Sequence, residues 1–202
     1  MEILELDDYI ESHSTPEPAY LKEIVRQTHL TRLHPRMLSG QIQGRFLSMI
    51  SRMIKPLYIL ELGTFTGYSA LCLAEGLQEN GKIITIEIDD EQEDFILNNF
   101  KSSPYADKIE LITGDALKII PTLKYTFDLV LIDAEKSEYP EYLQAVITLL
   151  NKNSFIIADN VLWDNKVLNP KNLSDPSTKG IMEFNKMITE NCYKYLSQVP
   201  KD

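Results

Sequence analysis

Short apolar runs alternate with segments of helical periodicity from residue 57 to residue 158, and this alternation limits the fold more than any other feature of the sequence. Each run has the length of a strand, and each is followed by an acid or a turn signal. Because nearly continuous apolar strands are buried on both faces, the pattern predicts an α/β fold with a parallel sheet between two layers of helices. The expected strands are Leu57–Leu62, Ile83–Ile88, Ile109–Ile112, Phe127–Ile132 and Phe155–Ala158.

The rest of the chain is predicted to be mostly helical. Helices should precede the first strand, and Lys55-Pro56 should end the third of them, which follows Gly40. The polar stretch 165–178 is interpreted as a loop and residues 179–196 as a last helix. We expect one domain over residues 1–202, with a helical cap (1–55) and a sheet core (56–202). The helices expected between strands are Tyr68–Leu77, Glu91–Phe100, Ala116–Leu123 and Tyr139–Leu150.

Composition and charge exclude several classes of partner. The chain is 44% hydrophobic with a formal net charge of -10, so it disfavours nucleic acid. No apolar run approaches the roughly 20 residues that a membrane span needs. The acidic start, MEILELDDYIESHS, does not match a secretory signal. These observations predict a cytoplasmic protein without a membrane partner.

Two strand tips carry a pattern that suits a nucleoside-containing ligand. The first strand runs into Glu61-Leu62-Gly63 and then into a second glycine four residues on, where a ligand can approach the backbone. Ser69 falls in the first turn of the next helix. Glu87 ends the second strand 24 residues after Gly63, a position from which an acid can accept hydrogen bonds from ribose hydroxyls. An ordinary turn and a solvated strand-end acid remain the alternatives.

Acids also follow the third, fourth and fifth strands. Asp115 is placed to cap a helix, to bind an adenine amino group, or to do both. If the fourth and fifth strands are neighbours, Asp133, Asp159 and Asn160 meet at one edge, and three oxygen donors suit a hard cation such as Mg²⁺. Lys136 then points toward the same place and can serve as a base. Turn acids and a surface lysine are the alternatives.

In this order and spacing the motifs resemble those of the cation-dependent, S-adenosylmethionine-dependent O-methyltransferases, which include the catechol and caffeoyl-CoA O-methyltransferases. The resemblance covers about residues 37–184. Ala134 and Glu135 make the chain look more like bacterial or plant members than like the animal catechol enzymes. The motifs are ELGTFTGYSA, IEID, GDAL, LIDAEKSEYPEYL and ADNVLW.

The resemblance implies a class I methyltransferase fold, a Rossmann-like doubly wound sheet, with a role for each matching residue. Lys136 looks like the base, and Asp133, Asp159 and Asn160 look like ligands of a divalent cation, Mg²⁺ first and Mn²⁺ or Ca²⁺ as alternatives. Ser39 would lie beside the cofactor, and a homodimer is expected. The implied contacts to S-adenosylmethionine are Met37, Glu61, Gly63, Ser69, Glu87, Asp115, Ala116 and Asp133.

The chain departs from the family pattern at one point, and the resemblance leaves three possible functions. Family members end their sheet with an antiparallel hairpin, which is missing or altered here because no pair of strands is recognisable after Asn191. The favoured function is methyl transfer to a hydroxyl of a small catechol-like or hydroxylated aromatic acceptor. The alternatives are methylation of a tRNA hydroxyl at a wobble uridine, and cofactor binding without turnover.

Overall fold

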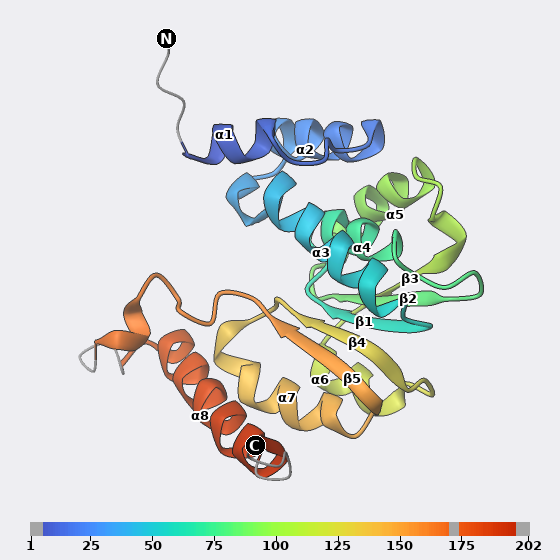
Figure 1. The fold of residues 1–202 in the computed structure, drawn as a ribbon. Helices are drawn as coiled ribbons and strands as arrows, with labels where there is room; N and C mark the ends of the chain where they lie inside the picture. Colours follow the sequence, from blue (N-terminus) through green and yellow to red (C-terminus); the bar gives the residue numbers. More distant parts are fainter. Residues whose placement is uncertain (1–5, 170–173, 197–202) are drawn as a thin grey trace.

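The structure is a computed structural model that describes residues 6–169 and 174–196, with the side chains of residues 7 and 191–196 left out. Five parallel strands form one sheet in the order β3-β2-β1-β4-β5, with helices above and below it (Figure 1). This confirms the doubly wound sheet expected from the sequence. The strands are β1 (Tyr58–Leu62), β2 (Lys82–Glu87), β3 (Ile109–Thr113), β4 (Phe127–Ile132) and β5 (Leu150–Ala158).

The helices connect these strands and extend the chain at both ends (Figure 1). The α-helices are α1 (Leu6–Ser12), α2 (Ala19–Thr31), α3 (Gly40–Ile54), α4 (Tyr68–Ala74), α5 (Glu93–Lys101), α6 (Ala116–Ile119), α7 (Tyr139–Ile147) and α8 (Pro176–Leu196). Short 3-10 turns are η1 (Pro35–Met37), η2 (Asp90–Gln92), η3 (Ala106–Lys108), η4 (Ile120–Thr122), η5 (Lys136–Glu138) and η6 (Lys166–Leu168). Among the described residues, no helix has both the length and the apolar character to cross a membrane.

Alternation along the strands builds a separate core on each face of the sheet. On β1, Ile59 faces a core completed by α2, α3, α4 and α5, whereas Leu60 and Leu62 face a core completed by α6, α7 and α8. Both sets of side chains are fully buried. Burial on both faces is the physical reason that these strands appear as continuous apolar runs in the sequence.

Several boundaries differ from the sequence predictions. The helix expected to reach Leu150 ends at Ile147, because Leu150 pairs with Phe127 and already belongs to β5. The loop expected through residue 178 is also too long, since α8 begins at Pro176, where the Asp175 carboxylate accepts hydrogen bonds from the backbone and hydroxyl of Thr178.

Within the described residues, the chain after β5 forms η6 and α8 and no strand. Helix α8 continues to Leu196, and residues 197–202 lie outside the described part. The end of α3 follows the prediction: Lys55 adopts a left-handed conformation (φ 53°) and its N–H donates to Ser51 O at 2.7 Å.

Candidate active site

The tip of β1 is packed tightly against the tip of β4. Gly63 has φ 92°, and a Cβ atom added to it would lie 2.1 Å from the carbonyl oxygen of Asp133. The Gly63 N–H donates to Ile86 O of β2 at 3.0 Å, so the residue is fixed from the other side as well. A glycine is therefore required here by the close approach of two strand tips, in addition to any ligand that the turn accommodates.

Glu61 is a fully buried carboxyl group beneath this turn. The Thr85 hydroxyl donates to Glu61 Oε2 at 2.5 Å. Burial raises the pKa of Glu61 to about 8, although the nearby Ser69 and Thr85 hydroxyls oppose the shift. No group among the described residues forms a hydrogen bond with Glu61 Oε1. An unsatisfied buried carboxyl oxygen is costly, so its presence marks a place where a cationic or N–H-bearing ligand fits.

Glu87 shapes the glycine turn from the end of β2. Its Oε2 accepts hydrogen bonds from the backbone N–H groups of Thr64 at 3.2 Å and Phe65 at 2.7 Å, and its Oε1 accepts one from Asp89 N at 3.0 Å. From the sequence, Glu87 was expected only as an acid that could accept hydrogen bonds from a ligand. The structure adds that Glu87 holds the turn in place, with lone pairs still available for hydroxyl donors.

Asp115 caps a helix, as one of its two sequence interpretations predicted. It accepts the Leu117 N–H at 3.0 Å at the start of α6, and Lys118 Nζ lies 3.0 Å from its other oxygen. The hydrogen bond from Lys118 lowers the pKa of Asp115. Ala116 is buried immediately after it. The pair lies at the tip of β3, next to the tip of β2 that carries Glu87.

The tips of β4 and β5 bring two carboxyl groups together. The Asp133 N–H donates to Leu62 O at 2.9 Å and the Asp159 N–H donates to Ile132 O at 3.0 Å, which places the two acids on adjacent strands. Burial raises the pKa of Asp133, Lys136 opposes the shift, and the charge and hydrogen bond of the Asp159 carboxyl raise it further. Asn160 follows in a left-handed conformation (φ 56°). We call Asp133, Asp159 and Asn160 the carboxylate edge.

Lys136 reaches the carboxylate edge from the turn η5. Its Nζ lies 2.7 Å from Asp133 Oδ1 and 2.9 Å from the Tyr139 hydroxyl, and the residue is only 8% exposed. Tyr139 is fully buried and its hydroxyl also lies within hydrogen-bond distance of the carbonyl oxygens of Ile132 and Asp159, at 3.1 and 3.2 Å. The Tyr139 hydroxyl therefore holds the Lys136 ammonium in place.

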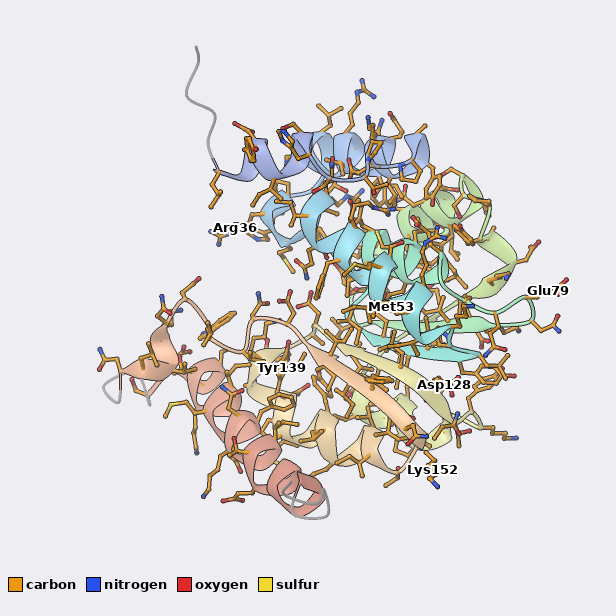
Figure 2. All side chains as sticks on the ribbon, in the orientation of Figure 1. Arg36, Met53, Glu79, Asp128, Tyr139 and Lys152 are labelled. Atoms are coloured by element: carbon orange, nitrogen blue, oxygen red, sulfur yellow. The ribbon has the colours of Figure 1, made fainter. Side chains whose placement is uncertain are left out.

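The start of α3 lies at the same end of the sheet. Figure 2 shows Arg36 and Tyr139 toward this end and Asp128 and Lys152 toward the other. Met37 is exposed on η1, and Ser39 precedes α3. On the first turn of α3, Gln43 Nε2 donates to Asp159 Oδ2 at 2.9 Å. Sequence reasoning missed Gln43, because its partner lies 116 residues away and no local pattern marks the contact.

The carboxylate edge fits a hard cation by the chemistry of its donors. Among the described residues, no group of three or more His, Cys, Asp or Glu side chains is placed to hold a metal ion. The edge instead has two carboxyl groups, and the residue after Asp159 is Asn160, whose side chain also carries an oxygen of the kind that Mg²⁺ and Ca²⁺ bind. Two carboxyl groups face one lysine ammonium here, and a cation between them would relieve their mutual repulsion.

Known proteins resemble this chain in both sequence and fold. It is 36% identical over 153 residues to a catechol O-methyltransferase of Niastella koreensis, covering 74% of this chain and 69% of that one. It is 34% identical over 161 residues to caffeoyl-CoA O-methyltransferase 1 of Eucalyptus globulus, covering 76% and 64%. The matched part therefore spans about two thirds of the length of these relatives.

Two solved structures show the same arrangement with a cofactor or its product. The O-methyltransferase TomG from Streptomyces achromogenes, in complex with SAM, has a TM-score of 0.86 at 30% identity and covers 92% of this chain and 84% of TomG. An O-methyltransferase from Bacillus cereus, in complex with SAH, has a TM-score of 0.85 at 31% identity and covers 92% and 85%.

The five-stranded fold and these similar proteins thus define an S-adenosylmethionine-dependent methyltransferase, as the sequence indicated. The sequence model of a protein family described as O-methyltransferase matches residues 11–200 of this chain. The chain belongs to this O-methyltransferase family.

Proposed function

We propose that this protein transfers the methyl group of S-adenosylmethionine to a hydroxyl of a small catechol-like or hydroxylated aromatic acceptor, with a divalent cation at the carboxylate edge. The observation that carries the proposal is the placement of Lys136. Its buried Nζ lies 2.7 Å from Asp133 and on the same strand-tip side as the turn at Gly63. A proton acceptor, a candidate cation site and a candidate cofactor site are therefore adjacent.

Each group in this arrangement has a distinct task. S-adenosylmethionine supplies an electrophilic methyl group, and a divalent cation would lower the pKa of a chelated acceptor hydroxyl. Lys136 takes the hydroxyl proton on Nζ. The Tyr139 hydroxyl keeps that nitrogen facing the carboxylate edge. Burial of both side chains excludes water from the lysine.

The cofactor site that we propose follows the row of strand tips. The unpartnered Oε1 of Glu61 suits the ammonium of the methionine part, with Gly63 and Ser69 beside it. Glu87 faces the ribose and Asp115 with Ala116 the adenine, in the order of the strands β1, β2 and β3. Asp133 borders both the cofactor and the cation, and Met37 covers the cofactor.

The acceptor class is supported by the names of the relatives. Catechol and caffeoyl-CoA O-methyltransferases share about a third of their residues with this chain over the matched part. Both names point to aromatic rings with hydroxyl groups. For this chain we propose the shared chemistry, an aromatic hydroxyl, and neither named acceptor in particular.

The test is transfer of labelled methyl from S-adenosylmethionine to a panel of 3,4-dihydroxyphenyl compounds, with Mg²⁺ and with EDTA. We expect transfer that EDTA abolishes and that Lys136→Met lowers about 10²- to 10⁴-fold. Lys186→Met is the control, since Lys186 lies on the exposed side of α8 with Glu190. Transfer that survives EDTA refutes the cation, and transfer unchanged by Lys136→Met refutes the base. Cofactor binding without transfer to any compound refutes the acceptor class.

A further inference from the structure

Gln43 connects two parts of the protein that the proposed function treats separately. It belongs to the first turn of α3, and its Nε2 donates to Asp159 Oδ2 of the carboxylate edge at 2.9 Å. The Asn160 N–H donates to the other oxygen, Oδ1, at 2.6 Å. Both oxygens of Asp159 are therefore held by N–H donors, which fixes the plane of the carboxylate.

The backbone on the C-terminal side of Gln43 is held rigidly. A Cβ atom added to Gly44 would lie 2.6 Å from Tyr68 Cε1 and 2.8 Å from Cys72 Sγ, so α3 packs closely against α4 at that point. The next residue, Arg45, forms two hydrogen bonds to Glu75, at 2.7 and 3.0 Å. The Arg45 and Glu75 side chains are 11% and 4% exposed. The bidentate Arg45–Glu75 pair is buried, and the contact of α3 with α4 at Gly44 leaves no spare room. Together they prevent α3 from rotating.

The chemistry of the Gln43 side chain suits orientation without neutralisation. Lys136 places a positive charge next to Asp133, whereas the amide of Gln43 is uncharged and orients Asp159 without forming an ion pair. Each carboxyl oxygen of Asp159 retains a lone pair beside its N–H donor. Gln43 therefore sets the direction of the Asp159 carboxyl group and leaves lone pairs for another ligand.

We propose that Gln43 is a positioning residue that holds Asp159 in the orientation needed to bind the divalent cation. The inference rests on the proposed function, because it assumes a cation at the carboxylate edge. Partners in the second layer around a metal ligand typically change metal affinity or activity about 10- to 100-fold when they are removed. The contact also ties the start of α3 to the residue that follows β5.

The experiment measures Mn²⁺ binding to the cofactor-free protein by calorimetry, with thermal unfolding recorded without metal. Gln43→Met keeps the length of the side chain but has no donor, and we expect it to bind Mn²⁺ at least about tenfold more weakly at a similar melting temperature. Gln43→Ala is measured beside it, so that loss of folding in one variant leaves the other to decide. Gln41→Met is the control, because Gln41 donates to Glu11 O at 3.2 Å, away from the carboxylate edge.

The outcomes separate this inference from the function on which it rests. Weaker Mn²⁺ binding in both Gln43 variants and unchanged binding in Gln41→Met support it. Unchanged binding in a folded Gln43 variant refutes the positioning role and leaves the cation site standing. Absence of Mn²⁺ binding by the unsubstituted protein refutes the cation site, and the inference with it.

Discussion

Replacing Gly63 by alanine tests whether the turn after β1 is set by its neighbouring strand. The added Cβ would lie 2.1 Å from Asp133 O and 2.8 Å from Asp133 C, far inside contact distance. The carbonyl cannot withdraw freely, because the Asp133 N–H is bonded to Leu62 O at 2.9 Å and the Gly63 N–H to Ile86 O at 3.0 Å. The left-handed conformation adds about 1–2 kcal/mol of strain for alanine.

Together, the strain and the disrupted hydrogen bonds should lower the free energy of unfolding by about 3–5 kcal/mol. In a domain of this size each kcal/mol corresponds to roughly 2–4 °C in melting temperature, so we expect a decrease of about 6–20 °C. Urea unfolding followed by circular dichroism gives the free energy, and a thermal scan gives the temperature.

Gly40→Ala is the matched control. Gly40 also has a positive φ, 75°, but a Cβ atom there would meet nothing within 4 Å. Gly40→Ala should lower the free energy of unfolding only by the backbone strain, about 1–2 kcal/mol. Equal losses in the two variants would refute the argument, because the contact with Asp133 would then contribute nothing.

Three further predictions follow from other parts of the structure. Burial raises the pKa of Glu61 to about 8, above its unfolded value of about 4.3, so the folded form keeps a proton that the unfolded chain releases. Stability should therefore fall as the pH rises from about 4.3 to 8, by up to about 1.4 kcal/mol per unit, and Glu61→Gln should flatten this profile in urea unfolding. Glu75→Gln should destabilise by about 3 kcal/mol in the same assay, because it breaks a buried pair with Arg45, whereas Glu23→Gln at an exposed pair should change the stability far less. The homodimer that we expect should appear in light scattering, and Phe46→Lys, on the exposed apolar side of α3, should dissociate it if the N-terminal helices form the contact. A dimer that resists this change would place the contact elsewhere.

Local patterns predicted most of the fold. The run Phe127–Ile132 has the same bounds as β4, and the two cores on either side of β1 follow from its alternation. The errors occur where a long-range contact overrides the local preference. Leu150 continues a helical pattern but pairs with Phe127, and Asn153 then adopts φ 67° within the same strand. Pairing across the sheet decided that boundary.

The candidate site divides in the same way. Asp133 and Lys136 are three residues apart, so a single turn brings them together, and this pair was recognisable in the sequence. The cap formed by Asp115 is likewise local. The hydrogen bond from Gln43 to Asp159 joins residues 116 positions apart, and only the packing of α3 reveals it.

The sequence by itself therefore determined the order of strands and helices, the residues at the strand tips and the enzyme class that they indicate. These depend on hydrophobic periodicity and on spacing along the chain, which are local properties. The tertiary structure decided that Gly63 must make room for Asp133, that Glu61 is left with an unpartnered oxygen, and that α3 reaches the carboxylate edge. Those features depend on which strand tips become neighbours when the sheet assembles with β1 at its centre. A pattern along the chain does not specify which distant residues become neighbours in space.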